Sequence, residues 1–311
     1  MTKKKVALLL HGIVGVRNRH GELVDYSRSL KTHINNLKNN NTCECDIFLH
    51  FWQSNEMAVD DKKILSDFNP KKHITIKQPN FGIGKEHAEI FQKKYRHRRQ
   101  RFGNIDACIY HLERDMSLIT GLKLANDLKT SYELENHFKY DFVIKSRFDC
   151  LLGYKPNFYE LDSRNFYSLP YNKHKKIFNN QHYKRLTDFF WITGSENMNK
   201  LTAISDVYKD LFKNDMFLQF YDGMIENAWI WHMIETGLYE KIRIQDFVES
   251  PISLDRFFNK NNKLNEEIRQ RKTGCLPFTG WSRHKTYEKD EFINKMNIIE
   301  QKIKNSIEGV K

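Results

Sequence analysis

The sequence predicts an α/β fold, with a mixed and mostly parallel sheet flanked by helices and a helical tail at the C-terminus. Short apolar runs alternate with helical patterns through the first half, an order typical of parallel strands joined by right-handed crossovers. The runs are almost continuously apolar, which favours a sheet covered on both faces. Hydrophobic residues make up 40% and aromatic residues 13% of 311 residues, so the chain can bury a core and wholesale disorder is excluded.

Each expected strand is recognised by a short apolar or aromatic stretch bounded by polar residues. In the second half two aromatic stretches follow each other with little room for a helix between them, and a short β-branched segment comes later. In chain order, the expected strands are 6–10, 46–52, 74–77, 141–145, 165–169, 188–193 and 242–244.

The expected helices carry apolar residues at helical spacing. In the first, Tyr26, Leu30, Ile34 and Leu37 form one stripe. Gly121 stands inside the longest helix, where it could mark a kink, and Ser195 is suited to cap the helix that follows it. In chain order, the expected helices are 25–37, 106–138, 196–212, 222–235 and 289–307.

The overall charge predicts an acidic partner. Lys and Arg number 51 against 39 Asp and Glu, so the formal net charge is +12. Such an excess suits a phosphate-bearing substrate, an anionic membrane surface or nucleic acid, and composition alone does not choose among them.

The cysteines and the N-terminal segment predict a reducing, cytoplasmic setting. The five cysteines include no C-x-x-C pair, so reduced thiols are expected rather than disulfides or zinc ligands. The apolar run at 6–10 is shorter than a signal peptide requires, and no stretch of the sequence is as long and apolar as a spanning helix.

The turn after the first strand is a candidate ligand loop. His11 and Gly12 follow the apolar run directly, and in open α/β sheets ligands bind beyond the carboxyl ends of the strands. The segment matches neither a dinucleotide fingerprint nor a P-loop, so a plain strand-to-helix turn is the alternative.

A second candidate lies at the end of the fourth strand. Strand alternation places Lys145, Arg147 and Asp149 on one side. Two cations beside a carboxylate suit a diphosphate with a divalent ion, because the cations offset phosphate charge and the carboxylate binds a hard metal. A structural Arg–Asp pair is the alternative.

Candidate acids come from the second half. Asp188 opens an aromatic strand, and Asp222 with Glu226 are spaced i,i+4 on an expected helix. A carboxylate near Trp229 and other apolar neighbours could have a raised pKa and serve as a general base. Ordinary stabilisation of the helix dipole is the alternative for Asp222.

A loop near the C-terminus could close over an anion. Residues 274–285 combine Trp281, Arg283 and His284, and a histidine there could bind a metal or a phosphate. A surface loop anchored by Trp281 is the alternative.

A basic run occupies residues 93–101, with six Lys or Arg in nine positions. It suits anionic lipid or nucleic acid, but its aromatics are too sparse for base stacking and no nucleic-acid-binding motif accompanies it. A solvated helix face is the alternative.

The order of these segments resembles a known family. The stretches 45–52, 140–149 and 188–195, within a similarity that covers most of residues 5–240, resemble GT-A-type, nucleotide-sugar-dependent glycosyltransferases of surface-polysaccharide (capsule and lipopolysaccharide) biosynthesis. The resemblance implies a catalytic domain at 1–285, with a nucleotide-binding half at 1–150 and an acceptor half at 151–285, followed by the tail at 286–311.

The resemblance also implies roles for individual residues. The nucleotide and diphosphate would be bound by His11, Gly12, His50, Trp52, Lys145, Arg147 and Arg283; a divalent metal by Asp149 and His284; and the acceptor would be activated by Asp222, Glu226 or Asp188. Arg147 replaces the first acid of the family's D-x-D motif, and an arginine there could itself neutralise the leaving diphosphate and make a Mn²⁺ or Mg²⁺ ion dispensable.

The leading hypothesis is therefore transfer of a sugar from a nucleotide-diphosphate donor to a carbohydrate or lipid-linked acceptor by a cytoplasmic enzyme. The basic run would hold this enzyme near an anionic membrane. A non-catalytic protein that binds nucleic acid or another anion through residues 93–101 is the alternative, as is another transferase of activated phosphate-containing donors.

Overall fold

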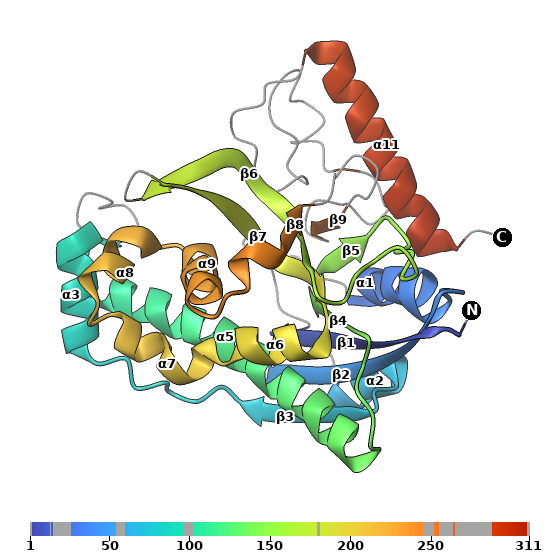
Figure 1. Ribbon diagram of the computed structural model, residues 1–311, viewed down its shortest axis with the longest axis horizontal. Helices are drawn as coiled ribbons and strands as arrows, with labels where there is room; N and C mark the ends of the chain where they lie inside the picture. The colour runs from blue at the N-terminus through green and yellow to red at the C-terminus, as the bar shows by residue number, and fades with distance from the viewer. Residues whose placement is uncertain are drawn as a thin grey trace.

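The computed structural model in Figure 1 has one central sheet with helices on both sides. It describes residues 2–12, 14, 26–53, 60–95, 102–178, 181–244, 252–254, 264 and 288–309, with the backbone alone at 169–178, 181–185, 189 and 253–254. Statements below concern these residues.

The strands confirm every expected strand position and add two more. The first sheet contains β1 (Lys4–Gly12), β2 (Cys43–Gln53), β3 (Lys72–Lys77), β4 (Phe142–Arg147), β6 (Phe166–Phe178), β7 (Gln181–Thr193) and β8 (Ile242–Ile244). A separate two-stranded sheet pairs β5 (Cys150–Leu152) with β9 (Ile252–Leu254).

The helices include three that the sequence patterns did not indicate, namely α2, α3 and α8. In chain order they are α1 (Tyr26–His33), α2 (Asp61–Phe68), α3 (Lys85–Tyr95), α5 (Ile105–Glu135), α6 (Ser195–Thr202), α7 (Ile204–Leu211), α8 (Asp215–Tyr221), α9 (Ile225–Glu235) and α11 (Lys289–Glu308), with single turns η1 (Ile34–Lys38) and η3 (Tyr239–Lys241).

The strand order of the main sheet is β3-β2-β1-β4-β7-β6-β8. The first four of these strands run parallel, β7 is antiparallel to both of its neighbours, and β8 is parallel to β6. The fold class is therefore the mixed, mostly parallel α/β arrangement that the sequence predicts.

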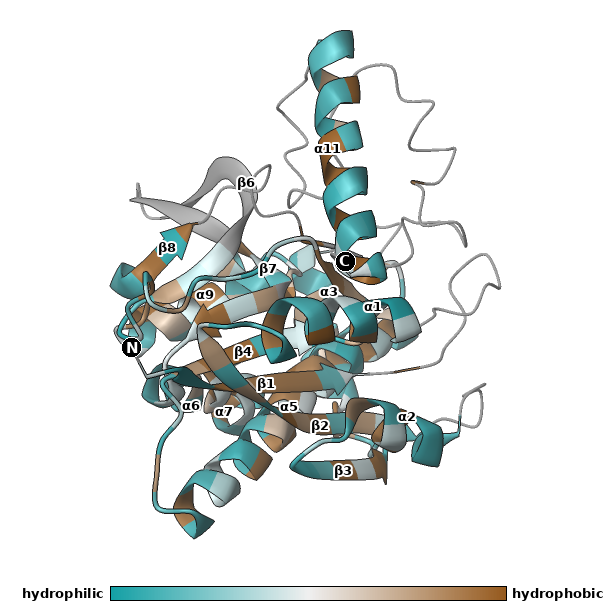
Figure 2. Ribbon diagram, turned by 90° about the vertical axis from the view of Figure 1, so that its right-hand side faces the viewer, coloured by the Kyte–Doolittle hydropathy of each residue, from teal (hydrophilic) through white to brown (hydrophobic). Residues whose placement is uncertain are grey.

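Two apolar layers cover the sheet, as its continuous apolar strands require. On one face α5 packs on β1 and β2, and on the other face α1 and α2 cover the same strands. Figure 2 shows the hydrophobic strands β1 and β4 enclosed between more polar helices. Alternation along β4 separates the layers, since Val143 joins the α5 layer whereas Phe142 and Ile144 join the other.

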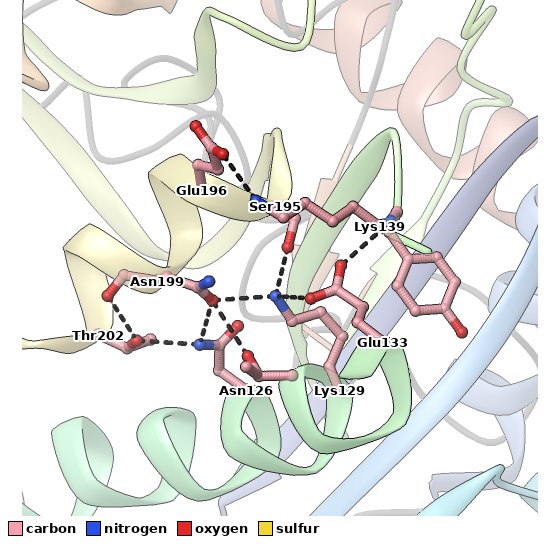
Figure 3. A network of polar contacts seen from close by, with 10 residues as sticks. Asn126, Lys129, Glu133, Lys139, Ser195, Glu196, Asn199 and Thr202 are labelled. Carbon is pink, nitrogen blue, oxygen red and sulfur yellow. Dashed lines mark hydrogen bonds and ion pairs between the residues drawn. The ribbon is translucent and has the colours of Figure 1, made fainter. Parts of the chain in front are cut away.

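Two expectations about the helices of the second half are wrong. The stretch expected as one helix is divided at Ala203 into α6 and α7. Ser195 does not cap α6, because Gly194 holds the N-cap position and the Ser195 hydroxyl instead accepts a hydrogen bond from the Lys129 ammonium at 2.5 Å. Figure 3 shows this hydroxyl pointing away from the helix end, toward α5.

The C-terminal helix α11 packs against α1, η1 and β5. Its apolar side, with Phe292, Met296 and Ile299, is buried with Leu151 of β5. The Asn35 side-chain amide also donates to the Ser306 carbonyl at 2.7 Å. The outer side of α11 is polar, as Figure 2 shows.

Four of the five cysteines lie among the described residues. Cys43, Cys45, Cys108 and Cys150 are buried and free, and Cys275 lies outside the described residues. In the part of the chain that the structure describes, no helix combines the length and apolar character needed to cross a bilayer.

Candidate functional site

The strand order creates a switch point between β1 and β4. From β1 the chain adds β2 and then β3 on one side, and β4 then pairs with the other side of β1. Ligands of open α/β sheets bind at such points, beyond the carboxyl ends of the strands. His11 of β1 lies in register with Arg147 of β4 and with His50 of β2, so the candidate residues form a row across three strands.

The end of this row carries a group of charged side chains. Arg147 donates from Nε and Nη2 to the two carboxylate oxygens of Asp149, both at 2.9 Å, and its Nη1 lies 3.4 Å from Oδ2 of Asp188. The Arg147 side chain is 26% exposed and each aspartate 19%, so the group is accessible from one side. We call Lys145, Arg147, Asp149, Asp188 and Glu226 the charged cluster.

Lys145 is the deepest member of the charged cluster. It is only 2% exposed, and its ammonium lies 4.5 Å from the centre of the Trp191 ring on β7. Burial lowers the pKa of Lys145 to about 8, although the nearby Asp188 carboxylate opposes the shift. The ammonium is therefore held within the protein wall, where charge is screened less than in water.

Glu226 and Asp188 have opposite protonation tendencies. Burial raises the pKa of Glu226 to about 8, and the Asp188 carboxylate adds to the shift. Burial also opposes ionisation of Asp188, but Arg147 and Lys145 outweigh it and lower the pKa of Asp188. Two acids with separated pKa values are a frequent feature of catalytic sites, because one can exchange a proton while the other stays ionised.

His11, His50 and Trp52 lie beneath the charged cluster. All are at most 2% exposed, and among the described residues the four imidazole nitrogens and the Trp52 Nε1 have no hydrogen-bond partner. A β-carbon on Gly121 of α5 would meet Nδ1 of His50 at 3.1 Å and Nδ1 of His11 at 3.4 Å. Gly121 therefore allows α5 to approach the two imidazoles within one continuous helix.

Desolvation keeps these imidazoles neutral. Burial lowers the pKa of His50 to about 4 and, together with the charge of Lys145, lowers that of His11 well below its usual value.

Gly12, which follows His11, has a φ angle of +118°, a backbone conformation that favours glycine. No atom lies within 4 Å of the place that an added β-carbon would take, so the backbone conformation and not the space favours glycine here.

Asp222 does not share a helix face with Glu226, so that prediction is wrong. Asp222 ends α8 in the left-handed conformation, with φ 53°, whereas α9 begins only at Ile225. The Asp222 backbone N–H donates to the Tyr95 hydroxyl at 3.0 Å.

A buried acid on α5, Asp115, was not identified from the sequence. It is fully buried and accepts hydrogen bonds from Arg114 at 3.0 Å and from the hydroxyls of Tyr221 and Tyr208. Arg114 and Asp115 both influence the pKa of Glu226, so this group adjoins the charged cluster. The signal was present, because Asp115 stands on the same helical stripe as the buried Leu112 and Ile119.

The described residues do not fit a divalent metal site. Both oxygens of Asp149 already accept hydrogen bonds from Arg147. Among the described residues, no three His, Cys, Asp or Glu side chains are arranged to hold an ion. Arg283 and His284 lie outside the described residues, as does the basic run beyond Tyr95.

Comparisons with known proteins give similarity to solved structures but none in sequence. No family model and no curated protein sequence matches the chain. The crystal structure of mouse xyloside xylosyltransferase 1 in its apo form is similar with a TM-score of 0.34 and 10% sequence identity, over 79% of this chain and 85% of that chain. The fold assignment above depends on the strand order and not on this similarity.

Proposed function

We propose that the chain is a glycosyltransferase that moves a sugar from a nucleoside-diphosphate donor to a carbohydrate hydroxyl in glycan synthesis. The observation that carries the proposal is the position of the charged cluster at the switch point between β1 and β4. This cluster contains cations that can bind a diphosphate and a carboxylate that can take the proton of a hydroxyl group.

The donor's diphosphate is bound at the carboxyl ends of β1 and β4. Arg147 supplies guanidinium hydrogen bonds, and Lys145 supplies a buried positive charge nearby. Both charges are in place before reaction, so they stabilise the negative charge that develops on the leaving group without reorganising.

The acceptor hydroxyl is deprotonated by Glu226. The oxygen of the acceptor hydroxyl forms a bond to the anomeric carbon of the donor sugar. The bond from that carbon to the diphosphate breaks at the same time, and the nucleoside diphosphate leaves with the electron pair. Ionised Glu226 takes the hydroxyl proton, and its pKa of about 8 is close to neutral pH, which suits general acid–base catalysis there. This single displacement inverts the anomeric configuration.

In this proposal the two halves of the chain bind different substrates. Residues 1–150 supply the donor half and 151–285 the acceptor half. The acceptor is a glycan, free or lipid-linked, of surface-polysaccharide synthesis, reached from the cytoplasmic side of an anionic membrane. Lys93 and Lys94, exposed at the end of α3, begin the basic run that would contact this membrane.

A ligand panel tests this function. Thermal unfolding is measured with UDP-, GDP-, CDP-, ADP- and dTDP-sugars, each with and without Mn²⁺, and with single-stranded oligonucleotides at several salt concentrations. We expect at least one nucleotide sugar to raise the unfolding temperature. Stabilisation by oligonucleotides alone, weakening with salt, would instead support the nucleic-acid-binding alternative.

A variant connects binding with the site. Asp149→Ala should lower hydrolysis of the stabilising donor by about tenfold or more, because Arg147 loses the carboxylate that orients it. The matched control is Asp162→Ala, which removes the corresponding partner of the exposed Arg164 two residues away and should leave hydrolysis unchanged. Full activity of a folded Asp149→Ala variant would remove Asp149 from the site.

A further inference from the structure

The resemblance described above would make Asp149 a metal-binding carboxylate, but in the structure its oxygens have another function. Each accepts one hydrogen bond of 2.9 Å from Arg147, one from Nε and one from Nη2. This bidentate arrangement fixes the plane of the guanidinium as well as its position. A metal ion bound by Asp149 would have to displace Arg147 from these oxygens.

The charges around Asp149 also disfavour a divalent ion. Mg²⁺ and Mn²⁺ are bound by several oxygen ligands, usually carboxylates that outnumber nearby cations. Here Asp149 and Asp188 are balanced by Arg147 and Lys145. Glu226, whose pKa is raised to about 8, adds no negative charge while it is protonated, so the charged cluster then has no net negative charge. A dication would therefore be repelled by Arg147 and Lys145 with no surplus of carboxylate to compensate.

Arg147 retains the capacity to bind an anion. A guanidinium has five N–H donors, and three of them make the contacts with Asp149 and Asp188. One N–H remains on each terminal nitrogen, and the side chain is 26% exposed. The contact between Nη1 and Asp188 is the longest of the three, at 3.4 Å, so it is the one that a stronger acceptor would replace most readily.

We propose that Arg147 takes the place of the divalent cation, binding the donor's diphosphate directly while Asp149 holds it in orientation, so that donor binding needs no metal ion. This inference rests on the proposed function. In it, Arg147 is a binding residue and Asp149 is a positioning residue.

The test is calorimetric titration with UDP, GDP, CDP, ADP and dTDP, in EDTA and in MnCl₂. For the diphosphate that binds best, we expect dissociation constants within about threefold of each other in the two buffers. Binding that is more than tenfold tighter in MnCl₂ than in EDTA would overturn the inference and leave the proposed function standing. If none of the five binds in either buffer, the proposed function fails and the inference with it.

A substitution of Arg147 distinguishes the effect of its paired N–H donors from the effect of its positive charge. Arg147→Lys keeps the positive charge but loses the paired N–H donors, and we expect at least tenfold weaker binding of the diphosphate in EDTA. Arg164→Lys, which changes the exposed arginine paired with Asp162, is the control and should bind as the wild type does. Unchanged affinity in Arg147→Lys would overturn the direct contact.

Asp149→Asn tests the positioning role. The amide can accept one hydrogen bond from Arg147 but not the charged bidentate pair. The affinity for the diphosphate in EDTA should therefore fall, and adding MnCl₂ should still not change that affinity. If the same variant instead abolished a Mn²⁺-dependent increase in affinity, Asp149 would be a metal ligand and the inference would be wrong. Circular dichroism of each variant, compared with Arg164→Lys, confirms that the fold is retained.

Discussion

Glu226 is the residue whose chemistry depends most on its surroundings. Burial in the first turn of α9, with the Asp188 carboxylate nearby, raises its pKa to about 8. The sequence predicted a raised pKa from the apolar neighbours of Glu226. It could not predict the contribution of Asp188, which is 38 positions away in the printed sequence and belongs to another strand.

The raised pKa of Glu226 predicts a pH-dependent stability. The folded chain keeps this proton up to about pH 8, whereas the unfolded chain releases it near the ordinary value of 4.5. The contribution of Glu226 to stability is therefore complete below about pH 4.5 and is lost as the pH rises through 8. Glu226→Gln, which does not titrate, should gain stability relative to the wild type between pH 5 and pH 9, by on the order of 1–3 kcal/mol.

Urea unfolding of both proteins at pH 5, 7 and 9 measures this difference. Glu196→Gln is the control, because the Glu196 carboxylate is exposed and paired with Lys139. An equal difference between Glu226→Gln and wild type at pH 5 and pH 9 would show that the pKa of Glu226 is not raised.

Two other predictions at the residue scale concerned side chains close together in the sequence, and their outcomes differ. The Arg147–Asp149 pair was the alternative that the sequence left open beside a diphosphate–metal site. The two residues are in contact because the chain turns at 148–149, directly after β4 ends at Arg147. The prediction that Asp222 and Glu226 share a helix face is wrong, because the chain turns at Asp222 and Gly223, with φ 53° and 63°, before α9 begins.

At the scale of elements, α5 contacts both β1 and β2 of the first half of the chain and α6 and α7 of the second half. Its 31 residues carry Gly121 against the imidazoles, Asp115 near the charged cluster and Lys129 against α6. Figure 3 shows the Lys129 ammonium between Glu133, Ser195 and Asn199. The distances are 3.1 Å to Glu133 and 2.9 Å to Asn199, and Lys129 is fully buried.

The buried pair Lys129–Glu133 should be costly to break on one side. Lys129→Met leaves the Glu133 carboxylate, 5% exposed, without its ammonium and should destabilise the fold by about 3–5 kcal/mol. Lys129→Met combined with Glu133→Gln should be less destabilised than Lys129→Met alone, since Gln keeps an acceptor for the Tyr140 N–H and carries no charge.

Chemical denaturation of these variants measures the difference. Lys123→Met is the matched control, because Lys123 and Asp127 form an i,i+4 pair on the solvent side of the same helix. It should change stability little. A single variant no less stable than the double variant would show that the ammonium does not compensate the Glu133 charge.

At the scale of the whole molecule, α11 joins the C-terminus to the N-terminal half. Its buried side packs with β5 and α1, elements that are more than 130 positions earlier in the sequence. The helix was expected from its pattern, but the surface that it covers was not, because no local feature of residues 289–307 specifies a distant partner.

Two neighbouring isoleucines of α11 test this packing. Ile299 is fully buried and Ile298 is 43% exposed. Ile299→Ala should destabilise the protein by about 2–4 kcal/mol, through lost burial and a residual cavity. Ile298→Ala should have little effect, because its side chain already contacts water. Equal urea midpoints for the two variants would show that α11 does not pack on the body of the protein in solution.

The sequence by itself determined the strands, most helices, the fold class and the grouping of Lys145, Arg147 and Asp149 at the end of β4. These depend on periodicity and on closeness in sequence, which act over a few residues. Only the tertiary structure decided that Asp188, Glu226 and Asp115 lie near this group, that His11 and His50 are buried beneath it, and that Asp149 is occupied by Arg147. These features depend on which strands become neighbours and on how far each side chain is removed from water, and both follow from long-range packing.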